Sequence, residues 1–139
     1  IFDKCWSAQI TDHQGKTSVD YKSHKDSQSG TWENKKFEID LKDNIIIFTV
    51  TATDYAVKKF KKLSLPSSKI YQEKIDIQVM TDEYIRSVPV DQTTLTGKKM
   101  PGRHIFVFNL DAKIIEQILE HPDYPQTNIL KCDEISGLW

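Results

Sequence analysis

Cys5 and Cys132 are the two cysteines of this 139-residue chain, and they lie near its opposite ends. A bond between them would join the first predicted strand to the last and restrict the unfolded chain, which is worth roughly 4–5 kcal/mol in the chain-entropy model. Disulfides persist in oxidising compartments, and a chain that starts at Ile1 suggests a removed signal peptide or an excised domain. We therefore expect a Cys5–Cys132 disulfide in a secreted or extracellular protein. A reduced, buried pair is the alternative.

Length and charge limit the kind of partner. We expect residues 1–139 to form a single β-rich domain, because the chain is long enough for one core and contains no linker or repeat. The formal net charge is −1, so no global field attracts nucleic acid or an anionic membrane. No apolar run approaches the 18 or so residues of a membrane span. We expect no nucleic-acid partner and no membrane span.

Apolar residues alternate with polar ones along most of the chain, which is typical of strands with one solvated face. The clearest hairpin joins residues 37–41 to residues 45–53 through the turn Lys42-Asp43-Asn44. Residues 105–110 form a near-continuous apolar run, as in a strand that is buried on both faces. Further strands are predicted at residues 4–10, 17–22, 75–79, 84–88 and 127–132.

Two segments favour a helix. Asp111 can cap a helix that runs to about Glu120, because Ile114, Ile115, Ile118 and Leu119 form one apolar stripe. Residues 55–63, with Asp54 as the cap, form the second segment, although a strand extension is open there. The predicted fold is mostly β. It is a single-domain antiparallel β-sandwich or closed β-barrel of about eight strands, with a short C-terminal helix before the last strand.

A basic patch is the strongest local charge feature. Lys58, Lys59, Lys61 and Lys62 place four cations within five residues. They could bind a sulfated glycan or an acidic protein surface, with Lys98, Lys99 and Arg103 added if the fold brings the loops together. Trp139 could anchor a partner if it is exposed beyond the last strand. The alternative is that the lysines are solvated and that Phe60 points inward.

Signatures of catalysis and of metal binding are absent from the sequence. No nucleophile elbow, phosphate-binding loop or zinc-protease motif occurs. The four histidines have no ligand spacing, and the cysteines do not form a C-x-x-C pair. We therefore expect a protein that is not an enzyme and that needs no cofactor and no metal.

Two short motifs resemble those of lipocalins. Gly30-Thr31-Trp32 is similar to the G-x-W motif of that family, and Thr53-Asp54-Tyr55 is similar to its T-D-Y motif. The resemblance implies an eight-stranded barrel that encloses a small apolar ligand. Both motifs are placed differently along the chain than in lipocalins. The leading hypothesis is therefore a non-enzymatic extracellular module that recognises a protein partner through its loops and the basic patch. A lipocalin-like carrier of a small hydrophobic ligand is the alternative.

Overall fold

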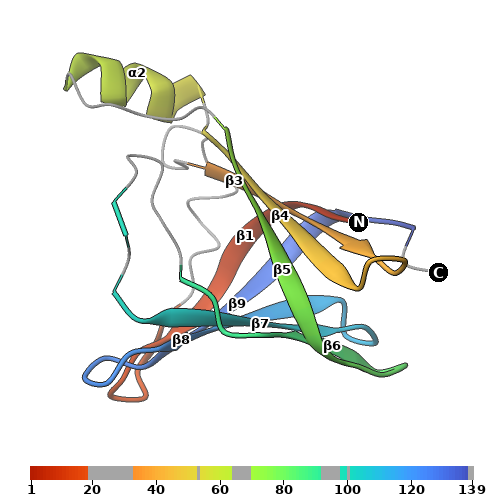
Figure 1. The fold of residues 1–139 in the computed structure, drawn as a ribbon. Coiled ribbons are helices and arrows are strands. Elements are labelled where there is room, and N and C mark those ends of the chain that lie inside the picture. Colours follow the sequence, from red (N-terminus) through yellow and green to blue (C-terminus); the bar gives the residue numbers. More distant parts are fainter. Residues whose placement is uncertain (19–32, 53, 64–69, 92–97, 100, 138–139) are drawn as a thin grey trace.

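A computed structural model describes residues 1–18, 33–52, 54–63, 70–91, 98–99 and 101–137 of the chain (Figure 1). Most of the elements are strands, in agreement with the alternating pattern of the sequence. In chain order they are β1 (Phe2–Thr11), β2 (Thr17–Ser18), β3 (Glu33–Asp40), β4 (Ile45–Ala52), α2 (Asp54–Lys62), β5 (Ile70–Met80), β6 (Tyr84–Ser87), β7 (Arg103–Asn109), β8 (Ile114–Glu120) and β9 (Gln126–Ile135).

The strands form one closed antiparallel barrel. From β3 to β9 each strand pairs with the next one along the chain, β3 pairs with β1, and β1 also pairs with β9. Eight strands therefore close into a cylinder without a free edge. The short β2 pairs with the end of β1, so the described part of the predicted hairpin at residues 4–10 and 17–22 is confirmed. The mostly β fold of about eight strands is confirmed, and it is a barrel.

The helix that we expected at residues 111–120 is wrong, because Ile114–Glu120 is strand β8. This segment forms ladders with β7 on one side and with β9 on the other. Its apolar residues occur as adjacent pairs, Ile114-Ile115 and Ile118-Leu119. Such pairs fit one stripe of a helix, but they equally fit a strand that is apolar on both faces. The short helix that precedes the last strand lies at Asp54–Lys62, where the second helical prediction is confirmed.

The two ends of the barrel differ. Figure 1 shows both chain termini at one end, which we call the terminal end, and α2 at the other, which we call the helix end. Tight turns such as Leu41–Asn44 lie at the terminal end. In that turn, Asp40 Oδ1 accepts hydrogen bonds from the backbone N–H groups of Lys42 and Asp43. The helix end carries the start of β3 and β7 and the end of β4 and β8.

Aromatic side chains fill the barrel from its middle to the terminal end. The ring of Phe37 contacts Phe48 on the neighbouring strand, with centroids 4.7 Å apart. It also contacts Phe106, at 5.2 Å, and Phe108, at 5.4 Å, although β3 and β7 are not neighbours. Phe2 reaches Phe108 in the same way, with centroids 5.3 Å apart. These contacts cross the barrel, so this half is a packed core.

The predicted disulfide is confirmed, and it lies where the barrel closes. Cys5 and Cys132 are cross-strand partners in β1 and β9 and are joined by a bond. Phe2 and Cys5 are three positions apart, so simple alternation would place them on opposite faces. Lys4 has a positive φ of 53°, and the register shifts between Phe2 and Cys5. This bulge turns both side chains into the barrel.

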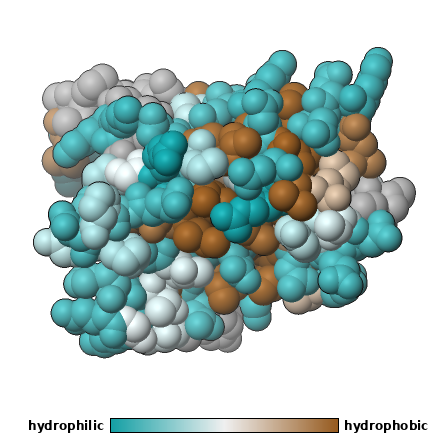
Figure 2. All heavy atoms as spheres, turned by 60° about the horizontal axis from the view of Figure 1, so that its bottom comes forward, coloured by the Kyte–Doolittle hydropathy of each residue, from teal (hydrophilic) through white to brown (hydrophobic). Residues whose placement is uncertain are grey.

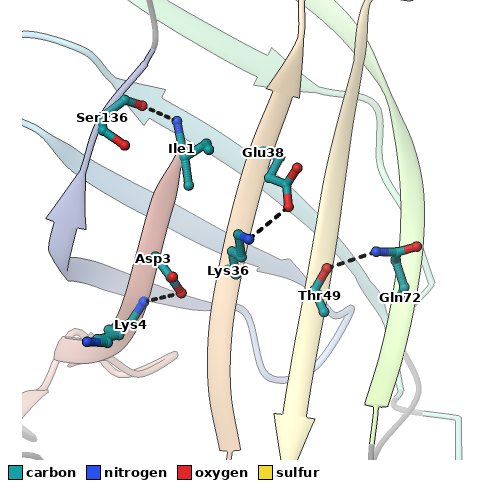
Figure 3. A network of polar contacts seen from close by, with 8 residues as sticks. All are labelled: Ile1, Asp3, Lys4, Lys36, Glu38, Thr49, Gln72 and Ser136. Carbon is teal, nitrogen blue, oxygen red and sulfur yellow. Dashed lines mark hydrogen bonds and ion pairs between the residues drawn. The ribbon is translucent and has the colours of Figure 1, made fainter.

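Polar contacts cover the outer side of β3, β4 and β5. Figure 3 shows the ion pair between Lys36 and Glu38 on β3, with 3.1 Å between the Lys36 Nζ and Glu38 Oε1 atoms. It also shows a hydrogen bond from Gln72 to Thr49, which are cross-strand partners in β5 and β4. These side chains alternate with those that enter the barrel, so this wall has the one solvated face that the sequence pattern predicts.

The opposite wall is less polar. Figure 2 shows the underside of the barrel as drawn in Figure 1, where apolar residues gather among polar ones. At outward positions, Ile105 of β7 and Ile118 of β8 are cross-strand partners, and Ile105 is buried. β7 is therefore apolar toward the outside as well as toward the core. This explains why the sequence at residues 105–110 lacks the alternation of the other strands.

Candidate functional site

Polar side chains point into the barrel near the helix end. They occupy inward strand positions, where the alternating pattern of the strands would place apolar residues. Lys35 shares the inward face of β3 with Phe37 and Ile39. Glu73 shares the inward face of β5 with Ile75, which is buried. A charged side chain inside a barrel is costly unless it has a partner or a function. Both residues have a partner, so the helix-end interior accommodates charge, unlike the apolar core, and it is the candidate site.

Glu73 is held by its own strand. Tyr71 Oη donates a hydrogen bond to Glu73 Oε2 over 2.7 Å, and this bond is partly buried. Both side chains lie on the inward face, two residues apart, and Tyr71 packs against the core cluster. The phenol therefore orients the carboxylate, because a charge-assisted bond of this length is strong.

A chain of hydrogen bonds crosses the other side of the interior, from β1 through β9 and β8 to β7. Asn128 Nδ2 donates to Ser7 Oγ over 2.9 Å and makes a longer contact of 3.4 Å with Gln117 Oε1. Gln117 Nε2 lies 2.9 Å from His104 Nδ1. The strand register places Gln117 opposite Asn128, so the four side chains form one connected network.

The direction of this network fixes the tautomer of His104. Burial first, and the positive charge of Lys35 second, lower the pKa of His104 to about 4. The imidazole is therefore neutral at pH 7 and carries one proton. Gln117 donates to Nδ1 through its amide nitrogen, so Nδ1 is the acceptor and the proton is on Nε2. His104 presents an N–H donor on the far side of its ring.

Two buried polar atoms of this network have no hydrogen-bond partner within the described part of the chain. They are Nε2 of His104 and Oδ1 of Asn128. His104 is only 4% exposed. A buried donor or acceptor without a partner costs about 1–3 kcal/mol, so such atoms are rare in stable cores. One donor and one acceptor inside the same barrel are the features expected of a site that is completed by a ligand.

The backbone around His104 is fixed by its neighbours. His104 and Val90 exchange two backbone hydrogen bonds, of 2.7 and 2.8 Å. Gly102, two residues before His104, has a φ of +78°, and a Cβ there would lie 2.7 Å from the carbonyl oxygen of Glu120. Ser87 Oγ accepts a buried hydrogen bond from the backbone N–H of Phe106. The start of β7, and therefore the position of the imidazole, is set by close packing.

The residues of the predicted basic patch on α2 lie outside the barrel interior. Lys58, Lys61 and Lys62 are exposed, and Lys59 is half-buried with an interaction of its own. Ala56 of the same helix is fully buried in the core cluster. The helix thus docks through one side and turns three lysines to solvent. The inward orientation considered for the Phe60 side chain lies outside what the structure describes.

The remaining predicted binding residues lie on elements other than α2. Lys98, Lys99 and Arg103 are exposed, and they belong to β7 and the segment before it. α2 follows β4, which is not a neighbour of β7 in the barrel. Lys99 forms an ion pair with Asp91 over 3.1 Å. Trp139, like the lipocalin-type segments Gly30-Thr31-Trp32 and Thr53, lies outside the described residues.

The interior polar residues were missed from the sequence, although a signal for two of them is present. In residues 35–39 and 71–77 the inward positions read Lys-Phe-Ile and Tyr-Glu-Ile-Ile. A charged residue at the first or second inward position of an otherwise apolar face interrupts the alternation. Gln117 gave no such signal, because residues 111–120 were assigned to a helix, and His104 lies just before the strand predicted at residues 105–110.

The described residues contain no group of three or more metal-ligand side chains that could hold a metal ion. Nor does any helix in this part of the chain have the length and apolar character needed to cross a membrane. Comparison with known family models, curated proteins and solved structures finds no match. The fold and the interior of the barrel are therefore the basis for a proposal about function.

Proposed function

We propose that this protein binds a small molecule inside the helix end of its barrel. The observation that carries the proposal is the pair of buried, unsatisfied atoms, His104 Nε2 and Asn128 Oδ1. They belong to a polar network in a region that otherwise packs apolar side chains, and Lys35 and Glu73 enter the same interior. Polar networks inside a protein reduce stability unless they are fully satisfied, so a ligand that completes this one explains why it is present.

The expected ligand differs from the apolar one implied by the lipocalin resemblance. The barrel is filled from its middle to the terminal end by an aromatic layer, which consists of the rings of Phe2, Phe37, Phe48, Phe106 and Phe108. A long apolar molecule that runs the length of the barrel would have to displace them. The part of the interior that offers unsatisfied groups is polar. We therefore propose a small ligand with hydrogen-bonding groups, seated above the aromatic layer.

The test follows the imidazole of His104 by NMR. Protein with ¹⁵N-labelled histidine is mixed with a library of small polar molecules, and native mass spectrometry reports any ligand that co-purifies. Compounds that bind should shift the His104 ring signals, and Asn128→Leu should abolish this effect. Thr127→Val, on the outward side of the same strand, should preserve it. A library in which nothing perturbs His104, together with a crystal structure that shows only water on Nε2, would overturn the proposal.

Binding rather than catalysis is the proposed role, and an exported location is proposed with it. The interior offers hydrogen-bond donors and acceptors, but His104, with a pKa of about 4, is a poor general base at neutral pH. The Cys5–Cys132 disulfide supports an oxidising compartment. Thiol alkylation of protein taken from its native source tests the location, because two free thiols would count against export.

A second candidate function is recognition of an acidic protein surface by α2. Lys58, Lys61 and Lys62 are exposed at the helix end, where Figure 1 shows α2 standing out from the barrel. Replacing the four lysines 58, 59, 61 and 62 by Ser should weaken binding to poly-glutamate, more so at low salt. Replacing Lys42 and Lys131 by Ser is the control, since these exposed lysines lie away from α2. Equal affinity of both variants would remove this candidate.

A further inference from the structure

The proton on His104 Nε2 decides which chemical group a ligand can present there. Nδ1 is occupied by the amide nitrogen of Gln117 at 2.9 Å. Nε2–H is therefore a donor that is buried and without an acceptor among the described residues. A ligand ammonium would place donor against donor at this atom. A carbonyl, hydroxyl or carboxylate oxygen would complete the bond.

The charges near His104 Nε2 limit further which ligand group can bind there. Lys35 is the charged residue that acts on the His104 imidazole from across the barrel, and its positive charge helps to lower the pKa of the ring. The same positive charge attracts an anion at that position. Glu73 is the opposing charge in the interior and is bound by the Tyr71 hydroxyl, but Lys35, not Glu73, is the charge that acts on the pKa of His104. The Nε2–H donor of His104 and the positive charge of Lys35 therefore both favour a negatively charged acceptor group on the ligand.

We propose that the ligand is a small organic acid whose carboxylate accepts the Nε2–H of His104 beside Lys35. This proposal rests on the proposed function, since it names the ligand class of the same site. The remaining orphan atom, Asn128 Oδ1, accepts a hydroxyl or amide N–H where the acid carries one, a contact that the bond between the carboxylate and His104 does not need. The aromatic layer below holds no unsatisfied polar group, so the apolar part of the acid points toward the helix end or lies on the rings.

Three probes of equal length test the charge preference: octanoate, octylamine and 1-octanol. Calorimetry and the ¹⁵N signal of His104 Nε2 measure binding of each to the full chain. Octanoate should bind at least about tenfold more tightly than octylamine, because its carboxylate accepts the Nε2–H bond, whereas the octylammonium ion has no acceptor and is repelled by Lys35. Octanoate should also move the Nε2 signal, since its carboxylate is bound to that atom. Tighter binding of octylamine would overturn the carboxylate assignment.

Two lysines on one strand provide the matched variants. Lys35→Gln should weaken octanoate binding roughly tenfold and leave 1-octanol binding unchanged. Lys36→Gln, which removes a cation of the outward face, should change neither. Equal effects of the two variants would contradict a carboxylate beside Lys35. If octanoate fails while other small molecules still shift His104, the carboxylate assignment is wrong and the binding function stands. If no small molecule shifts His104, both proposals fall.

Discussion

The side-chain amide of Gln117 lies 2.9 Å from Nδ1 of His104, and this contact orients the imidazole inside the barrel. Gln117 is on β8 and His104 on β7, and they are offset by two residues in the ladder, since His104 pairs with Leu119. The contact is thus diagonal along one inward face. It leaves the second ring nitrogen of His104 directed away from Gln117, which is what makes the barrel interior chemically specific.

The buried imidazole makes stability depend on pH. The pKa of His104 is lowered from 6.5 to about 4, so the unfolded chain binds a proton that the folded chain does not in this range. The free energy of unfolding should therefore fall as the pH drops from about 6.5 to about 4, by roughly 3 kcal/mol from this residue. Urea unfolding across this range measures the slope.

His104→Gln, which cannot titrate, should flatten that dependence. The exposed His13 provides the control, because His13→Gln should leave the slope unchanged. Equal slopes in the wild type and in His104→Gln would contradict a neutral, buried imidazole.

Replacing His104, Gln117 and Asn128 together should stabilise the protein, whereas removing one of them should destabilise it. His104→Leu alone takes the acceptor from the Gln117 amide and should cost about 1–3 kcal/mol. The triple variant His104→Leu/Gln117→Met/Asn128→Leu removes the network with side chains of similar size. It should be as stable as the wild type or more so, because stability at binding sites is often sacrificed for function. It should also fail to bind ligand. Chemical denaturation compares the three proteins, and a triple variant less stable than His104→Leu would show that the network is structural.

Gly102 should tolerate no side chain. A Cβ at this residue would lie 2.7 Å from the Glu120 carbonyl oxygen and 3.0 Å from a methyl carbon of Leu119. Gly102→Ala combines this clash with a φ of +78° and should lower stability by more than about 2 kcal/mol. Gly15 has the same φ but nothing within 4 Å of its Cβ position. Gly15→Ala should therefore cost only about 1 kcal/mol. Thermal melts of the two variants should differ, and equal melting temperatures would argue against the close approach.

The disulfide should contribute strongly to stability. Cys5 and Cys132 are 127 residues apart in the chain, so the bond restricts nearly the whole unfolded ensemble. The double variant Cys5→Ala/Cys132→Ala should lose about 2–5 kcal/mol. Denaturation of this variant and of the reduced wild type should give similar midpoints. If the variant matches the oxidised wild type instead, the bond adds nothing to the closure of the barrel.

Much of the barrel could be predicted from the sequence, since alternation is a local property. The hairpin at residues 37–53 was recognised from its period and from the turn Lys42-Asp43-Asn44, and the disulfide from its two terminal positions. β8 was assigned wrongly, because Ile114–Glu120 satisfies the patterns of a helix and of a two-faced strand together. Only pairing with β7 and β9 decides between them, and such pairing is not visible in a local window.

The candidate site was beyond the reach of the sequence for a related reason. Ser7, His104, Gln117 and Asn128 come from four strands and meet only when the barrel closes. None of them is part of a motif, and their polarity is ordinary. The lysines at 58, 59, 61 and 62 are close together in the sequence and were noticed at once, yet they lie outside the interior. Charge runs are easy to see in a sequence, whereas single polar residues at inward positions require the register.

The bond between Cys5 and Cys132 also limits the routes by which the proposed ligand could enter the barrel. It locks the seam between β1 and β9, so this seam cannot part while the thiols remain oxidised. The phenylalanine rings plug the deeper half. The proposed ligand would therefore have to enter and leave from the helix end of the barrel.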